Sequence, residues 1–219
     1  MKKNLLISIA ICSFASLSRS QSITPKFTYN AEISLPVAMA NEPFDDIMQG
    51  LVNVSTYGQY QLPFGLNFGA GIHYSYFTVN EFSVPSPVYG GVHSGSVFGK
   101  AGWGKFHTDK FATDWGVKFG YSQNYFTTDV NKENGVNPIQ INSSFAEFVA
   151  SFILAADSRN SYRWIVGYGM QGFGFRPSHI GLNSNEGYDP IGFNKLTQYI
   201  TFGFGYTYYF RIKETEGGN

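Results

Sequence analysis

Two residues that can do chemistry together stand close to each other in the stretch Gly71-Ile72-His73-Tyr74-Ser75. An imidazole can take the proton of a serine hydroxyl and so activate it as a nucleophile, provided that both side chains share a face. His73 and Ser75 are two residues apart, which puts them on one face of a β-strand. The spacing makes them a candidate base and nucleophile.

The other reactive side chains form no recognisable site. Histidines occur at positions 73, 93, 107 and 179, without the spacing of metal ligands. Asp45 and Asp46 are adjacent, but they fall in an expected loop, where carboxylates favour solubility. The chain contains no phosphate-binding loop, zinc motif or nucleophile elbow. We therefore expect no metal and no cofactor.

The elements that position these residues are predicted by alternation of polarity. Eight segments carry large apolar side chains at every second position, which is the period of a strand. They are expected at 26–38, 50–62, 66–79, 92–105, 111–125, 143–155, 162–175 and 196–210. In the last segment, Phe202, Phe204 and Tyr206 share one face, and small residues share the other.

The connections between these strands alternate in length. Short connections at 62–65, 106–110 and 156–161 alternate with long ones at 39–49, 80–91, 126–142 and 176–196. Short turns at one end and long loops at the other are typical of transmembrane β-barrels. Aromatic residues also gather near the long loops, at Tyr76, Phe77, Tyr125, Phe126, Phe173 and Phe175. We interpret these rings as a girdle at the membrane–water interface.

Composition narrows the class of protein further. Charged residues are 14% and aromatic residues 18% of the chain, whereas soluble domains carry about 25% charged residues. The mean hydropathy of −0.15 is too low for a helical membrane protein. No basic stripe is present, which argues against a nucleic-acid partner.

The N-terminus predicts a secretory signal peptide over residues 1–20. Lys2 and Lys3 precede an apolar run to about Leu17, and small residues precede Gln21, where cleavage is expected. The alternative, a transmembrane anchor, is disfavoured because the run is shorter than the roughly 20 residues that span a bilayer. Cleavage removes Cys12, so the mature chain contains no cysteine.

These patterns resemble the small eight-stranded outer-membrane β-barrels, such as the transmembrane domain of outer membrane protein A and its porin-family relatives. The resemblance covers 26–210 and is most specific in the last strand, where Tyr206, Tyr208 and Phe210 are similar to the family's C-terminal assembly signal. The tail, 211–219, departs from the family, in which the phenylalanine often ends the chain. It is also too short for a peptidoglycan-binding domain.

The resemblance implies an all-β fold, an eight-stranded antiparallel up-and-down transmembrane barrel with short periplasmic turns and long outer loops. The barrel domain would span 21–210, followed by a short periplasmic tail. It also implies location in the outer membrane, contact with outer-membrane lipid, and recognition of the last strand by the barrel assembly machinery.

The strand phases also predict which polar side chains face the barrel interior. The expected inward charges are Glu32, Lys100, Asp114, Lys118, Glu147 and Arg163. Lys100 sets the phase of its strand, because a lysine facing lipid costs roughly 2–4 kcal/mol. An interior with three charges of each sign predicts salt bridges across a lumen that eight strands leave just wide enough for side chains.

We expect a narrow or plugged barrel with a structural or surface-interaction role and an unknown ligand at the outer loops, chiefly 80–91 and 176–196. One alternative is a small-solute channel that passes Lys118 and Glu147. Another is a lipid A-modifying outer-membrane enzyme, but His73 and Ser75 are predicted to point away from lipid, and Tyr76 replaces the asparagine that usually follows the serine. We therefore expect no catalytic residues. The last alternative is a soluble periplasmic β-sandwich or lipid-binding barrel.

Overall fold

The computed structural model describes residues 26–84, 87–108, 110–136, 138–182 and 187–210. The expected signal peptide, 1–20, and the expected tail, 211–219, lie outside these residues.

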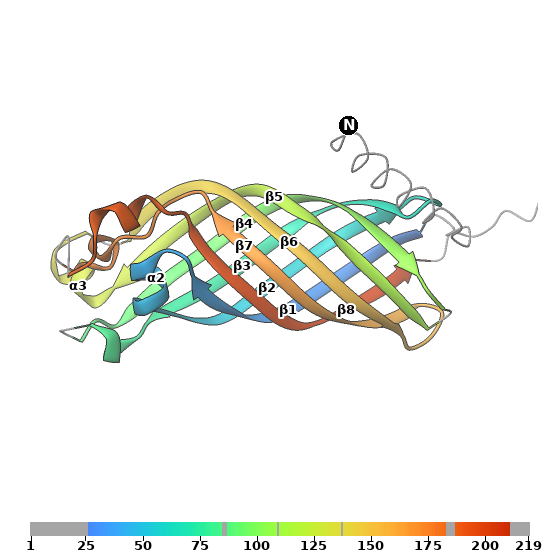
Figure 1. Cartoon of the computed structure of the whole chain (residues 1–219), viewed down its shortest axis with the longest axis horizontal. Coiled ribbons are helices and arrows are strands. Elements are labelled where there is room, and N and C mark those ends of the chain that lie inside the picture. Colours follow the sequence, from blue (N-terminus) through green and yellow to red (C-terminus); the bar gives the residue numbers. More distant parts are fainter. Residues whose placement is uncertain (1–25, 85–86, 109, 137, 183–186, 211–219) are drawn as a thin grey trace, which may run out of the picture.

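Eight strands form one closed antiparallel barrel (Figure 1). They are β1 (Lys26–Met39), β2 (Met48–Gln61), β3 (Leu66–Val79), β4 (Gly90–Phe106), β5 (Phe111–Thr128), β6 (Ile139–Ala155), β7 (Asn160–Gln171) and β8 (Thr197–Phe210). Each strand pairs with the next in sequence, and β8 pairs with β1, beginning with Phe27 opposite Phe210. The predicted fold class is confirmed.

The two ends of the barrel differ. The β2–β3, β4–β5 and β6–β7 connections are short and form the turn end, where β1 begins and β8 finishes. The long connections form the loop end and carry α2 (Glu42–Ile47), η2 (Glu81–Ser83), α3 (Asp129–Glu133), η3 (Pro177–Ile180) and η4 (Pro190–Asn194). In the described part of the chain, no helix is long and apolar enough to cross a membrane.

Two strand boundaries differ from the sequence prediction by four residues, and the others by three or fewer. β6 begins at Ile139 rather than 143, and β7 finishes at Gln171 rather than 175. Phe173 and Phe175 continue the alternation of β7, but they belong to an apolar core at the loop end. Alternation alone does not distinguish a longer strand from a loop that buries every second residue.

The outer wall of the barrel carries an apolar belt. Ile33, Ile72, Phe119 and Phe204 are each more than half exposed, and they come from four different strands. So much exposed apolar surface is rare on soluble proteins, whereas lipid covers it at no cost. The belt therefore identifies the membrane-facing surface.

Candidate functional site

The lumen is filled by polar side chains. The inward-pointing residues that the sequence predicts are all buried, each with 7% or less of its surface exposed: Glu32, Asn53, Gln59, Asn67, His73, Ser75, Lys100, Asp114, Lys118, Ser122, Glu147, Arg163, Gln171 and Thr201. Alternating strand geometry explains this placement, because the intervening residues form the apolar belt.

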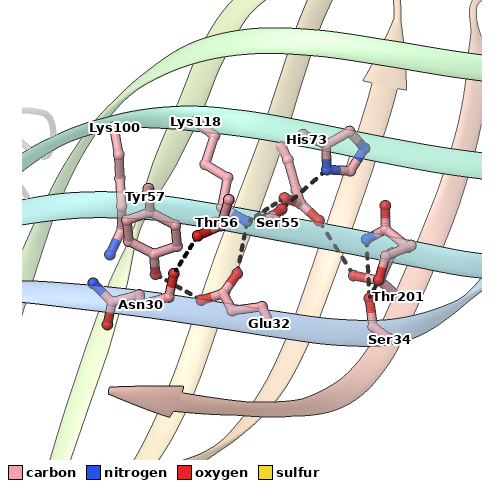
Figure 2. Close-up of polar contacts among 12 residues, drawn as sticks. Asn30, Glu32, Ser34, Ser55, Thr56, Tyr57, His73, Lys100, Lys118 and Thr201 are labelled. Atoms are coloured by element: carbon pink, nitrogen blue, oxygen red, sulfur yellow. Dashed lines mark hydrogen bonds and ion pairs between the residues drawn. The ribbon is translucent and has the colours of Figure 1, made fainter. Parts of the chain in front are cut away.

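Lys118 of β5 reaches across the lumen to carboxylates from two other strands. Its Nζ lies 2.9 Å from Glu32 Oε2 and 2.8 Å from Glu147 Oε2. It also donates a hydrogen bond to Ser55 Oγ at 3.1 Å. Figure 2 shows Lys118 directed between Glu32 and Ser55. One cation thus joins β1, β2 and β6 through the middle of the barrel.

Tyr57 links the second cation to this group. Arg163 Nη1 lies 3.0 Å from Glu32 Oε1 and donates to the Tyr57 hydroxyl at 2.6 Å. The same hydroxyl donates to Glu32 Oε1 at 2.6 Å. The ring of Tyr57 also lies under Lys100 and Lys118, with the two Nζ atoms 5.2 Å and 5.5 Å from its centroid. Such cation–π contacts help to hold cations away from water.

The third cation has its own carboxylate. Lys100 Nζ lies 2.6 Å from Asp114 Oδ2 and donates to Gln59 Oε1 at 2.7 Å. Asn67 donates to the other Asp114 oxygen at 2.9 Å. Arg163 Nη2, 3.7 Å from Asp114 Oδ2, connects this pair to the rest.

We call the connected set the lumen network: Glu32, Tyr57, Lys100, Asp114, Lys118, Glu147 and Arg163. The structure brings all six charged residues named by the sequence into this network. Tyr57 is the one member of the network that carries no charge, so the list of inward charges does not contain it. Its inward phase on β2, beside β1, was the available signal; in the register Tyr57 pairs with Asn30, two residues from Glu32.

Close packing in the network depends on glycine at two positions of neighbouring strands. A Cβ at Gly205 would stand 2.8 Å from Arg163 Cγ, and one at Gly167 would stand 2.9 Å from Glu147 Oε1. Both distances are shorter than van der Waals contact. These glycines therefore make room for the charged side chains.

Below the network, towards the turn end, the lumen holds a cavity of about 20 Å³ lined by Gln59, Gln61, Asp114 and Arg163 among others. This volume holds about one water molecule.

His73 and Ser75 both lie in the lumen, and both ring nitrogens of His73 are directed to residues other than Ser75. His73 Nδ1 is 3.0 Å from Ser55 Oγ, and Nε2 is 3.5 Å from the Tyr199 hydroxyl. The imidazole stacks on Phe145, with 4.6 Å between ring centroids. Within the part of the chain that the structure describes, no cluster of three or more His, Cys, Asp or Glu side chains suits a metal ion.

An apolar core closes the loop end of the barrel. We call it the outer cap, and it comprises Ala38, Phe44, Ile47, Met48, Phe77, Val79, Val88, Val92, Phe126, Phe175, Ile180 and Tyr199. Phe44 of α2 packs against Phe77 and Phe175, at centroid distances of 4.9 Å and 5.6 Å. Phe77 in turn contacts Tyr199 at 5.4 Å. The cap thus reaches down to the residue that neighbours His73.

Buried polar side chains join the long connections above this core. Asn41 donates to the Lys195 carbonyl at 2.8 Å and accepts from the Phe44 amide at 3.1 Å, which caps α2. Thr128 donates to the Ile180 carbonyl at 3.1 Å, and Asn131 donates to the His179 carbonyl at 3.0 Å. These bonds join three of the four long connections, and the β3–β4 connection is joined to them by the Asp129 amide, which donates to the Tyr89 carbonyl at 3.0 Å.

The cap corrects the interpretation of the aromatic girdle at this end. Phe77, Phe126 and Phe175 are buried in the cap, and Phe173 packs against it. Tyr76 and Tyr125 point outward as expected. The physical reason is strand phase, because Phe77 and Phe126 each follow an outward residue and so point inward.

His179 is enclosed by the aromatic rings of the cap. Its imidazole lies 5.1 Å from the Phe126 ring, and its Nδ1 accepts from the Arg176 amide at 3.3 Å. Burial lowers the pKa of His179 to about 4, and the positive charge of Arg176 acts in the same direction. This histidine is therefore neutral at neutral pH.

The expected assembly residues lie on the outer wall of the last strand. Phe210 is 44% exposed, and its ring contacts Phe27 and Tyr208 at 5.4 Å and 5.0 Å between centroids. Tyr206 is also exposed and lies beside Tyr162 of β7. All three rings therefore stand at the seam where the barrel closes.

Comparison with known proteins supports this fold. No family model matches the chain, and no curated protein matches it. Neisserial surface protein A is similar in structure, with a TM-score of 0.54 at 12% identity, over 86% of this chain and 100% of that one. A major outer membrane protein from Thermus thermophilus gives 0.54 at 10% identity over the same shares.

The attachment invasion locus protein of Yersinia pestis, in complex with the heparin analogue sucrose octasulfate, gives a TM-score of 0.48 at 7% identity. It too is covered over its whole length, by 86% of this chain. The chain has the fold of the small eight-stranded outer-membrane β-barrels, and its apolar belt is the surface that faces lipid.

Proposed function

We propose that this protein is a sealed outer-membrane barrel with a structural or surface-interaction role rather than a transport role. The observation that carries the proposal is the presence of two stacked seals. The lumen network fills the middle of the barrel with paired charges, and the outer cap fills the loop end with apolar side chains. A solute would have to disrupt both.

The channel alternative requires a polar path past Lys118 and Glu147. These two groups are 2.8 Å apart and buried. Separating the two charges while both stay buried would leave each of them uncompensated, which is unfavourable. That cost favours a closed resting state, and the apolar residues above the network offer no ligand to an ion.

The enzymatic alternative finds little support in the geometry. A lipid-modifying site must meet lipid, whereas His73 and Ser75 are on the lumen side of β3 and Ile72 and Tyr74 face the belt. The hydrogen bonds of His73 go to Ser55 and Tyr199. We therefore propose that the protein has no catalytic activity of this kind.

The remaining proposals concern export and assembly. We propose that residues 1–20 direct secretion and are cleaved before Gln21, and that 211–219 form a short periplasmic tail. Tyr206, Tyr208 and Phe210, on the closing strand, are proposed to be read by the barrel assembly machinery. An unidentified ligand would meet the outer loops, whose exposed residues include Asp45, Asp46 and Val136.

Complementation of a deletion strain separates these roles. One variant, Lys118→Met with Glu147→Gln, alters the lumen without changing its net charge. A second, Asp45→Ala with Asp46→Ala, alters the loop surface, and Lys110→Ala at the turn end is the matched control. Detergent resistance of cells with equal amounts of folded barrel is measured.

A structural role predicts that all three variants complement the deletion. A surface-interaction role predicts that the loop variant alone fails. Failure of the lumen variant alone, accompanied by altered uptake of small solutes, would contradict the proposal and favour a channel.

A further inference from the structure

Phe82 is an aromatic side chain that the outer cap leaves out. It lies in η2 of the β3–β4 connection and is 101% exposed. In contrast, Phe44, Phe175 and Phe193 of the other connections are buried. Full exposure of a phenylalanine side chain to water is unfavourable, so a surface that covers the Phe82 ring would stabilise this connection.

The turn that carries Phe82 is held in place by hydrogen bonds of Asn80. Asn80 donates its amide to the Ile47 carbonyl at 2.7 Å, which fixes the turn to the end of α2. Its side chain accepts from the Phe82 amide at 3.2 Å and donates to Ser83 Oγ at 2.9 Å. These hydrogen bonds fix the backbone of the turn in a conformation that leaves Phe82 exposed.

Phe82 lies three residues beyond the end of β3, a strand whose outward side chains face lipid. Phe68, Ile72 and Tyr74 point outward along this strand and are exposed, and Tyr76 follows them. Tyr74 and Tyr76 both contact His93 of β4, at 2.8 Å from the Tyr74 hydroxyl and with the Tyr76 ring stacked at 4.5 Å. Aromatic side chains with a polar contact of this kind prefer the membrane interface.

The position of η2 relative to the barrel also indicates what Phe82 can contact. In Figure 1 the green turn after β3 lies beside the barrel wall at the loop end, whereas α3 and the β5–β6 connection extend further along the barrel axis. A connection at the side of the barrel lies nearer to the membrane surface than one that extends along the barrel axis.

We infer that Phe82 inserts its ring into the interfacial region of the lipid surface and anchors the β3–β4 connection there. The exposed Glu81 carboxylate beside it remains at the polar level of the head groups. The inference is independent of whether the lumen conducts. The competing possibility is that Phe82 is buried by a protein partner. In that case the ring would remain in water in vesicles that contain only lipid and this protein.

Site-directed spin labelling tests the depth of this turn. The protein without residues 1–20 has no cysteine, so Glu81→Cys can be labelled in the otherwise unchanged chain, refolded into phosphatidylcholine vesicles. Two further labels provide the reference values. Ile72→Cys, in the belt, gives the value for lipid, and Val136→Cys, on the β5–β6 connection, gives the value for water. The ratio of collision rates with oxygen and with a water-soluble nickel chelate is measured, and heat-modifiable gel mobility confirms folding.

The label at position 81 should give a ratio several-fold above that at position 136 and below that at position 72. Adding Phe82→Ser should lower it to the value at position 136, whereas Phe82→Trp should keep it. A ratio at position 81 equal to that at position 136, or one unchanged by Phe82→Ser, overturns the inference.

Discussion

At the scale of single residues, Tyr57 decides how the lumen charges meet. Its hydroxyl stands between Glu32 and Arg163, and its ring lies beneath two lysines. Buried ion pairs are stable only when further hydrogen bonds satisfy the remaining donors and acceptors. The sequence identified the charges because a lysine or carboxylate is expensive in lipid. It could not identify their pairing, which depends on strand tilt and stagger.

Lys118→Met should destabilise the folded barrel by about 3–5 kcal/mol, because Glu147 loses its cation while it stays buried. Urea unfolding in detergent micelles, followed by tryptophan fluorescence, measures the change. Lys110→Met, at an exposed residue of the turn end, should change stability by less than about 0.5 kcal/mol.

A second substitution, at Glu147, tests whether the uncompensated charge causes the loss of stability. Lys118→Met combined with Glu147→Gln removes the uncompensated charge and should recover most of the lost stability. If the double variant is as unstable as the single one, the loss comes from packing rather than from the ion pair.

His179 gives a pH-dependent prediction outside the membrane. Its folded pKa of about 4 is below its unfolded value, so the unfolded cap binds more protons between pH 6.5 and pH 4. Cap stability should therefore fall on acidification through this window, by on the order of 1 kcal/mol. NMR titration of the histidine ring signals, assigned with His179→Gln, should show a midpoint near pH 4, and a midpoint near 6.5 would refute the buried environment.

At the scale of elements, strands were easier to predict than connections. Lipid on one side and a packed lumen on the other impose a period of two, which is visible in β5 and β8 from sequence alone. The connections obey no such period. Phe173 and Phe175 alternate as strand residues do, yet they fold into the cap, so the predicted end of β7 at 175 was wrong.

The packing of α2 predicts how the cap can be loosened. Phe44→Ala removes a buried ring that joins Phe77 to Phe175, and such truncations cost about 3–5 kcal/mol. We expect faster amide hydrogen exchange in α2 and η3, with unchanged protection of the strands.

Phe64→Ala is the matched control, since Phe64 is 56% exposed in the β2–β3 turn. It should leave exchange in α2 and η3 unaltered. Equal protection of α2 in the Phe44→Ala variant would show that the cap does not depend on this ring.

At the scale of the whole molecule, the closure of the barrel was predictable from the sequence. Of the two seals, the filled lumen was predictable and the outer cap was not. Even strand number and alternating connection lengths indicated an up-and-down barrel, and balanced inward charge indicated a plugged lumen. The outer cap was not predicted, because its residues come from connections and strand ends that are far apart in sequence. Only the folded chain brings Phe44, Phe126 and Phe175 together.

Single-channel recording tests the central claim most directly. The refolded chain is inserted into a planar bilayer, and insertion is verified independently by protease protection of the strands in the same lipid. We predict an inserted but silent protein, because both the lumen network and the outer cap must open before ions pass. Stable, discrete openings of the unmodified chain would contradict the account and make the lumen charges selectivity determinants of a small channel.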